Sequence, residues 1–155
     1  MRKVVVACAA LAIGACGSDP SSTSGSTASP VSDDIRQLCV DLINGYRATV
    51  GAAPYARWTS AETCADGQAQ SDSVTYAQTG KPHGAFGRCG ESAQDECPGW
   101  GGPPATAIKG CLDMMWKEGP GGGHYDNMSS TSRKRAACGF YILPSGSVWA
   151  VQDFQ

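Results

Sequence analysis

The sequence is poor in charged residues and has no excess of either sign. Only 17% of its 155 residues are charged, with 12 Lys and Arg against 14 Asp and Glu. Proteins that bind nucleic acids need a strong excess of positive charge, so we expect no nucleic-acid partner. The apolar run over residues 4–13 is too short for a membrane-spanning helix, which takes about 20 residues. The composition therefore excludes a polytopic membrane protein as well.

Histidine is also scarce, with two residues, whereas glycine and cysteine are plentiful. The 20 glycines and nine prolines, with few charges, indicate a fold rich in loops. Eight cysteines are many for a reduced cytosolic protein and ordinary for a secreted one. We therefore expect a small, disulfide-stabilised domain from an oxidising compartment.

The N-terminus has the pattern of a secretory signal. Arg2 and Lys3 precede the apolar run, which suits the hydrophobic region of a signal peptide. The run ends in Ile-Gly-Ala-Cys at Cys16, which resembles the lipobox of bacterial lipoproteins, where the cysteine becomes the lipidated first residue. Gly14 stands where that motif usually has Ala or Ser, so secretion without lipidation is the alternative. We expect a cell-envelope lipoprotein, in the outer membrane if the host has one, that touches the membrane only through this anchor.

These features predict three segments. Residues 1–15 are the signal peptide, and residues 16–34 are the lipidated cysteine with a linker rich in Ser, Thr, Gly and Pro. Such a linker reaches roughly 25 Å as a flexible coil, enough to hold a domain away from lipid headgroups. Residues 35–155 form one compact domain, which we expect to be monomeric.

The mature chain would hold an even number of cysteines available for disulfide bonds. Cleavage removes Cys8 and lipidation uses Cys16, and six remain, as a disulfide framework requires. Cys89 and Cys97 bracket a short loop, so we expect them to pair; free thiols are the alternative. The disulfide candidates are Cys39, Cys64, Cys89, Cys97, Cys111 and Cys138.

Helical periodicity predicts three helices. The first, capped by Ser32 and ended by Gly51, carries one continuous apolar stripe. The second runs from Thr59, the start of a Thr-x-x-Glu capping box, to about Ala77. One of its faces carries only small side chains, so another element can pack close against it. The third ends at Gly119. The first stripe is Ile35, Leu38, Cys39, Leu42, Ile43, Tyr46 and Val50; the second face is Ala61, Cys64, Ala65 and Ala69; the third is Ile108, Cys111, Leu112, Met115 and Trp116.

A β-hairpin closes the chain. Residues 137–143 and 148–154 alternate like strands around Pro144-Ser145-Gly146-Ser147. Helices together with a short hairpin predict an α+β fold. The basic run over residues 133–135 lies just before the first of these strands, and we interpret it as a solvated approach to a sheet edge, with an anion site as the alternative.

The two histidines are the candidate site residues. His83 and His124 both adjoin glycine in expected loops, and Glu91 and Glu118 lie close to them in sequence. Imidazole and carboxylate ligands suit zinc or a similar divalent metal if the two loops converge. Solvated loop histidines are the alternative, because no short motif forces these groups together.

A series of motifs resembles one protein family. Asn44-x-x-Arg47-x-x-x-Gly51-x-x-Pro54-x-x-x-Trp58 resembles the first-helix signature of the CAP superfamily, also called SCP-like, which includes cysteine-rich secretory proteins, antigen 5 and pathogenesis-related 1. The resemblance covers roughly residues 35–155, in order. Its further pieces are His83, Gly90-Glu91, Met115-Trp116-x-Glu118, Gly123-His124-Tyr125, Ala137-Cys138-Gly139 and residues 148–154.

The resemblance implies an α-β-α sandwich with a small antiparallel sheet and a central cleft. There the family places two histidines and two glutamates, which carry over to His83, Glu91, Glu118 and His124. Several departures weaken the match. Ser92 follows Glu91 where the family usually has Asn, no Trp follows Tyr125 closely, and the family's second signature near the C-terminus is not recognisable.

Three functions are compatible with these residues. The first is an extracytoplasmic binding protein whose cleft holds a divalent metal, a small apolar molecule or a protein partner, and which is not an enzyme. The alternative is a peptidase-like hydrolase, with zinc on the two histidines and one glutamate, and the other glutamate as general base. A third is an envelope protein in which the four residues only brace the fold. No oxyanion donor or substrate pocket can be named from the sequence, which counts against the hydrolase.

Overall fold

The structure is a computed structural model that describes residues 31–155. The expected signal peptide, Cys16 and linker residues 16–30 lie outside the described residues. The elements are α1 (Asp33–Thr49), β1 (Ala56–Arg57), α2 (Thr59–Thr79), β2 (Ala93–Trp100), α3 (Pro104–Trp116), α4 (Gly123–Ser129), β3 (Arg135–Ile142) and β4 (Val148–Phe154). Within this part of the chain, no helix is long and apolar enough to cross a membrane.

The sheet has four strands in the order β1-β3-β4-β2. The predicted hairpin is confirmed: β3 and β4 pair antiparallel, with Gly139 opposite Val151. β2 pairs antiparallel with the other side of β4, and the short β1 pairs parallel with β3. β2 is therefore an edge strand, so its outer side is open to the loops and helices around it.

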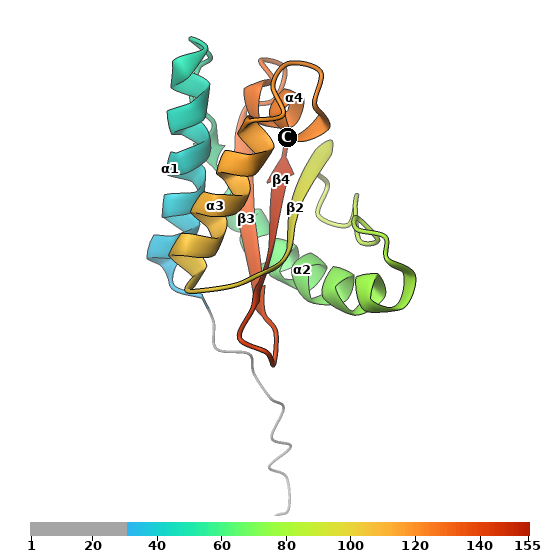
Figure 1. The fold of residues 1–155 in the computed structure, drawn as a ribbon. Helices are drawn as coiled ribbons and strands as arrows, with labels where there is room; N and C mark the ends of the chain where they lie inside the picture. The colour runs from blue at the N-terminus through green and yellow to red at the C-terminus, as the bar shows by residue number, and fades with distance from the viewer. Residues whose placement is uncertain (1–30) are drawn as a thin grey trace, which may run out of the picture.

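Helices cover both faces of the sheet, so the predicted α+β sandwich is confirmed. Figure 1 shows α1 and α3 side by side on one face, α4 beside the upper end of the sheet, and α2 on the opposite side. The larger core lies under α1 and α3, where Ile43, Ile108 and Leu112 are fully buried against the sheet. A smaller core lies under α2, where Ala65 and Ala69 pack on side chains of β4.

The first helix follows its predicted stripe with one exception. Cys39 and Ile43 are fully buried, but Val50 lies beyond the last helical residue and is 48% exposed. Arg47, at the same end of the helix, is buried in its place. The prediction for Val50 was wrong because the helix stops one residue earlier and the chain turns at Gly51, which has a positive φ.

The second helix also forms, but without the predicted capping box. The N-cap is Trp58, whose N–H donates to Ala136 O and extends the pairing of β1 with β3. Thr59 is therefore already inside the helix. Glu62 turns away from the helix end and pairs with Arg57, with Nε and Oε1 2.6 Å apart. Strand pairing and an ion pair outweigh the local cap here.

Three disulfides form within residues 31–155, and the predicted Cys89–Cys97 pair is wrong. Cys39 of α1 bonds to Cys138 of β3, Cys64 of α2 to Cys89, and Cys97 of β2 to Cys111 of α3. Cys89 lies before β2, whereas Cys97 lies well inside it. Since a strand advances about 3.3 Å per residue, β2 carries the second cysteine away from the first and toward α3.

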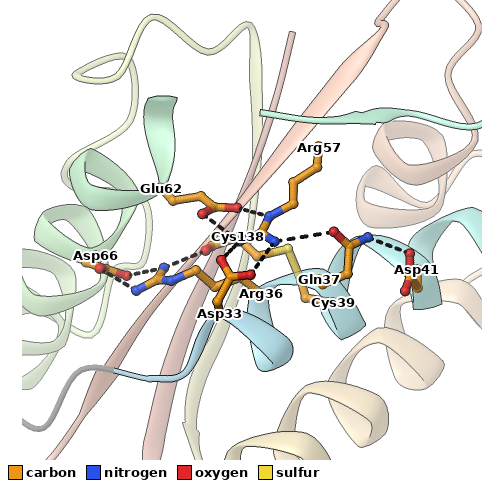
Figure 2. A network of polar contacts seen from close by, with 9 residues as sticks. All are labelled: Asp33, Arg36, Gln37, Cys39, Asp41, Arg57, Glu62, Asp66 and Cys138. Carbon is orange, nitrogen blue, oxygen red and sulfur yellow. Dashed lines mark hydrogen bonds and ion pairs between the residues drawn. A yellow bond between two sulfur atoms is a disulfide. The ribbon is translucent and has the colours of Figure 1, made fainter. Parts of the chain in front are cut away.

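A polar network surrounds the Cys39–Cys138 bond and joins α1 to α2 and β3 (Figure 2). The Arg36 guanidinium donates to both carboxylate oxygens of Asp66, at 2.8 and 2.7 Å, and to Cys138 O at 2.9 Å. Arg57 bridges Glu62 and Asp33 beside it. Because two planar guanidinium forks meet three carboxylates, the start of α1 is fixed against the sheet.

Candidate functional site

His83 lies in the loop between α2 and β2, as the sequence predicts. It is the one described non-glycine residue with a positive φ, 63°. Its N–H donates to Glu96 Oε1 at 3.1 Å, and its ring Nδ1 lies 3.1 Å from Gln94 Oε1. Contacts with two residues of β2 thus hold an otherwise unfavourable backbone conformation, and the imidazole Nε2 is left for a ligand.

Glu91 is buried just before β2, and both of its oxygens are occupied. Oε1 accepts from Gln68 Nε2 at 2.6 Å and from the N–H of Gly87, and Oε2 accepts from Cys89 N–H at 2.9 Å. These donors belong to its own loop and to α2. In this structure Glu91 therefore fastens the loop that carries His83 to α2.

His124 and Glu118 form a pair where the chain passes from α3 to α4. Glu118 follows α3, and His124 lies in the first turn of α4 rather than in the predicted loop. The ring Nδ1 of His124 lies 2.5 Å from Glu118 Oε1, and its N–H donates to Oε2 at 3.2 Å. The carboxylate thereby orients the imidazole and directs Nε2 away from the pair.

The four predicted site residues fall into three contact sets. Glu118 and His124 contact each other, His83 contacts Gln94 and Glu96, and Glu91 contacts its own loop and α2. Among residues 31–155, the one group of three potential metal ligands with atoms within 4.8 Å of one another is Cys89, Glu91 and Asp153. Cys89 is bonded to Cys64, so its sulfur is not a free ligand. Zinc binding by the four predicted residues stays a prediction.

The buried polar side chains of β2 were not predicted from the sequence. Gln94 Oε1 accepts from Nδ1 of the His83 ring on one side, and Gln94 Nε2 donates to Asp153 Oδ1 at 3.0 Å on the other. Asp95, on the opposite face of the strand, accepts from Asn127 Nδ2 of α4 at 2.7 Å. Burial raises the pKa of Asp95 and of Asp153 to about 7. β2 is thus a buried strand whose polar side chains connect α4 to the His83 loop.

Two carboxyl groups lie together beneath His83. Burial raises the pKa of Glu96 to about 9, and the neighbouring carboxyl of Asp72 adds to the shift. Both residues are almost fully buried. Both carboxylate oxygens of Asp72 and Oε2 of Glu96 lack a hydrogen-bond partner among the described residues. A proton shared between the two carboxyls satisfies this arrangement, because two adjacent buried carboxylates repel each other.

A cleft of about 290 Å³ opens along the β2 edge. We call it the β2-edge cleft. It brings an imidazole, two carboxamides and an aromatic ring that is half exposed to one solvent-facing hollow. Its lining residues are His83, Phe86, Ala93, Gln94 and Asn127. An apolar groove of about 400 Å³ lies elsewhere, on the outer side of α1, where Leu38, Leu42 and Tyr46 line it.

The sequence of this chain matches no protein-family model and no curated protein. Its structure is similar to two solved structures that belong to the CAP/SCP family. Hookworm platelet inhibitor aligns with a TM-score of 0.57 at 17% identity, over 82% of this chain and 71% of that one. Na-ASP-1 aligns with a TM-score of 0.56 at 10% identity, over 85% of this chain and 41% of that one. This chain thus spans less than half of the length of Na-ASP-1, and the fold is CAP-like.

Proposed function

We propose that this chain is an extracytoplasmic CAP-type binding protein, exported and lipid-anchored at Cys16, whose ligand enters the β2-edge cleft. The observation that carries the proposal is the convergence of His83, Gln94 and Asn127 on one open hollow beside Phe86. Three disulfides in the domain are typical of proteins from an oxidising compartment and support export.

The cleft has the composition of a small-molecule site. Binding sites combine apolar surface with a few fixed polar groups. Here Phe86 and Ala93 supply the apolar surface, and His83 and Asn127 supply the polar groups. Gln94 is held between His83 and Asp153, so it keeps the imidazole in one orientation. We infer a ligand with one apolar part and one hydrogen-bonding group.

Zinc is the second candidate ligand. In both histidines the ring Nδ1 is engaged, His83 with Gln94 and His124 with Glu118, so Nε2 is the atom that would bind a metal. A side-chain partner on the far nitrogen is the usual support of a metal-bound histidine. The zinc-dependent hydrolase requires both imidazoles and a glutamate on one ion, and of the two glutamates expected there, Glu118 is in contact with a histidine whereas Glu91 is not.

One NMR titration tests these alternatives. The full chain is exported with Cys16→Ser to prevent lipidation, oxidised and labelled with ¹⁵N, then titrated with zinc alone and with a library of small aromatic amides. His83→Asn removes the imidazole but tolerates the positive φ, because Asn adopts the left-handed region more readily than most residues. Lys109→Ala, on the exposed side of α3, is the control.

We expect aromatic amides to shift the signals of His83, Gln94 and Asn127 in the wild type and the control, and not in His83→Asn. Shifts that instead gather at Leu42 and Tyr46 would move the ligand to the α1 groove and reject the β2-edge cleft. Saturable zinc binding that is lost in both His83→Ala and His124→Ala would support a shared metal site. Equal zinc binding by the wild type and the two variants would exclude that metal site and the hydrolase with it.

A further inference from the structure

Arg47 is a buried cation without an acidic partner in the described part of the chain. It is 2% exposed, near the end of α1. Nε donates to Ala53 O at 2.8 Å, and Nη1 donates to Met128 O and Ser130 O at 2.7 and 2.8 Å. No carboxylate oxygen in residues 31–155 lies within 4.0 Å of its guanidinium. Buried charges are normally paired, so a neutral setting for this one is unusual.

The contacts of Arg47 show how it stabilises the fold, but none of them neutralises its positive charge. The guanidinium lies over the Tyr55 ring, 3.5 Å from the ring centroid, and its carbonyl partners hold the end of α4 against α1. Burial lowers the pKa of Arg47, as expected for a desolvated cation. Nη2 makes no hydrogen bond to any residue in the range 31–155. Nη2 is therefore the one guanidinium nitrogen left for a ligand within the described part of the chain.

Arg47 lines a small cavity that contains two more cations. We call it the arginine pocket; its volume is about 100 Å³, and it is more enclosed than the β2-edge cleft. Its lining residues are Arg47, Ala53, Pro54, Thr131, Arg133 and Lys134. The loop after α1 forms one wall and the loop before β3 forms the other. No acidic residue is among them.

The two additional cations are also free of carboxylates within the described residues. Arg133 Nε donates to Ser92 Oγ at 3.3 Å, and Lys134 Nζ donates to Thr131 O at 2.8 Å. Neither side chain forms an ion pair within 4.0 Å in residues 31–155. Three positively charged side chains thus line one pocket, and no carboxylate of the described residues pairs with them.

We propose that the arginine pocket binds a phosphate group, carried either by inorganic phosphate or by a phosphorylated ligand such as a lipid headgroup. The volume corresponds to a few water molecules, which suits one oxyanion and excludes a sugar or a base. The two N–H groups of Arg47 Nη2 are left to donate to an oxyanion, and Lys134 adds a point charge. Three cations favour a dianion over a carboxylate. Two of the three basic residues at 133–135 line the pocket, so the proposal takes up the anion site that the sequence left as the alternative for this run.

The test is a calorimetric titration of the exported, oxidised Cys16→Ser chain at low ionic strength. The probes are inorganic phosphate, glycerol 3-phosphate, and acetate as the monoanion. A fourth probe is a phosphatidylcholine vesicle containing phosphatidic acid, followed by cosedimentation. The variant Arg133→Ala/Lys134→Ala removes two pocket charges and leaves the structural Arg47 intact. The matched control Arg88→Ala/Lys109→Ala removes two exposed charges elsewhere, so both chains have the same net charge.

We expect saturable phosphate binding that is unchanged in the control and at least tenfold weaker in the pocket variant, with acetate much weaker than phosphate. Binding of vesicles and glycerol 3-phosphate but not of inorganic phosphate would identify the headgroup as the source. Equal losses in the pocket variant and the control would show a net-charge effect and overturn the proposal. The absence of saturable binding to every phosphate probe would also overturn it. A His83→Asn chain that still binds phosphate would separate this pocket from the β2-edge cleft.

Discussion

Gly139 of β3 lies directly against the backbone of Ala65 in α2. A Cβ built on Gly139 would meet the Ala65 carbonyl carbon at 2.2 Å and its oxygen at 2.4 Å, distances that no real contact allows. The small face of α2 and the missing side chain on β3 together bring helix and sheet into backbone contact. This approach also brings the Asp66 carboxylate within 2.7 Å of Phe140 N, which donates to it.

Gly139→Ala should lower the free energy of unfolding by about 3 kcal/mol, because the rigid α2 backbone must move to admit a methyl group. Gly45→Ala is the matched control, since Gly45 lies within α1 with nothing near its Cβ position. That variant should gain about 0.5–1 kcal/mol from helix propensity. Urea unfolding of both proteins measures the difference, and similar effects from the two would contradict the close contact.

Two buried disulfides should differ in their contribution to stability. Cys39–Cys138 closes 99 residues and Cys97–Cys111 closes 14, and all four cysteines are at most 1% exposed. In the chain-entropy account, removing the long closure costs about 4.7 kcal/mol and removing the short one about 3 kcal/mol. Thermal unfolding of the two double Cys→Ala variants should therefore place the Cys39/Cys138 variant lower. The reverse order would show that packing rather than loop length dominates.

Asp66 should be the most sensitive carboxylate of the polar network. Asp66→Ala removes both bonds from Arg36 and the bond from Phe140 N–H, and leaves the guanidinium with one carbonyl acceptor. We expect a loss of about 2 kcal/mol, typical of charged hydrogen bonds that are partly buried. The control is Asp113→Ala, which removes an exposed helical ion pair with Lys117 and should have little effect on stability.

Stability should fall as the pH rises from about 4 to about 7. Burial raises the pKa of Asp95 to about 7, whereas an unfolded aspartate ionises near pH 4. Between these values the folded chain keeps a proton that the unfolded chain has released. The free energy of unfolding then drops by about 1.4 kcal/mol per pH unit for this group, and the loss is complete above pH 7.

Asp95→Asn mimics the protonated side chain and keeps an oxygen for Asn127 Nδ2. It should reduce the pH slope by one proton and make the protein more stable than wild type at pH 8, with the advantage disappearing toward pH 4. Urea unfolding at several pH values measures the slope. An unchanged slope in this variant would mean that Asp95 is ionised in the folded protein at neutral pH.

The sequence predicted those helices and strands whose apolar residues follow a local periodic pattern. The three longer helices and the closing hairpin form where the apolar spacing places them. Asn44, the first residue of the family-like motif, braces the loop after α1, because its amide donates to Tyr55 O and accepts from Tyr55 N–H.

The parts that were missed depend on contacts distant in sequence. β2 has three consecutive polar residues, Gln94, Asp95 and Glu96, and lacks the alternation that predicts a strand. It is a strand because β4 pairs with it, and its polar groups find partners in α4, in β4 and in the His83 loop. The disulfide pairs were equally unavailable to spacing arguments, because each joins two separate elements.

The candidate site was predicted in residue identity more than in geometry. Contact between Glu118 and His124 follows from their short separation, since the glycine-rich turn folds back on itself. The enclosure of Glu91 could not be foreseen, because Gln68, its partner on α2, gives no sequence signal. The sequence showed the arginine pocket only as the basic run at residues 133–135. Arg47 lies 86 positions before Arg133 in the chain, so spacing could not indicate that the two line one pocket.

The bond between Cys39 and Cys138 also determines how the domain would carry mechanical load. A chain held at a membrane is pulled through its N-terminus, and tension would enter at the start of α1. Only the residues from Asp33 to Leu38 can be peeled away before the load reaches a covalent link to β3, which lies between β1 and β4. Force then reaches β3, which pairs with the short edge strand β1 on one side and with β4 on the other, so a tethered domain would resist extension by shear of the sheet instead of unravelling from its first helix.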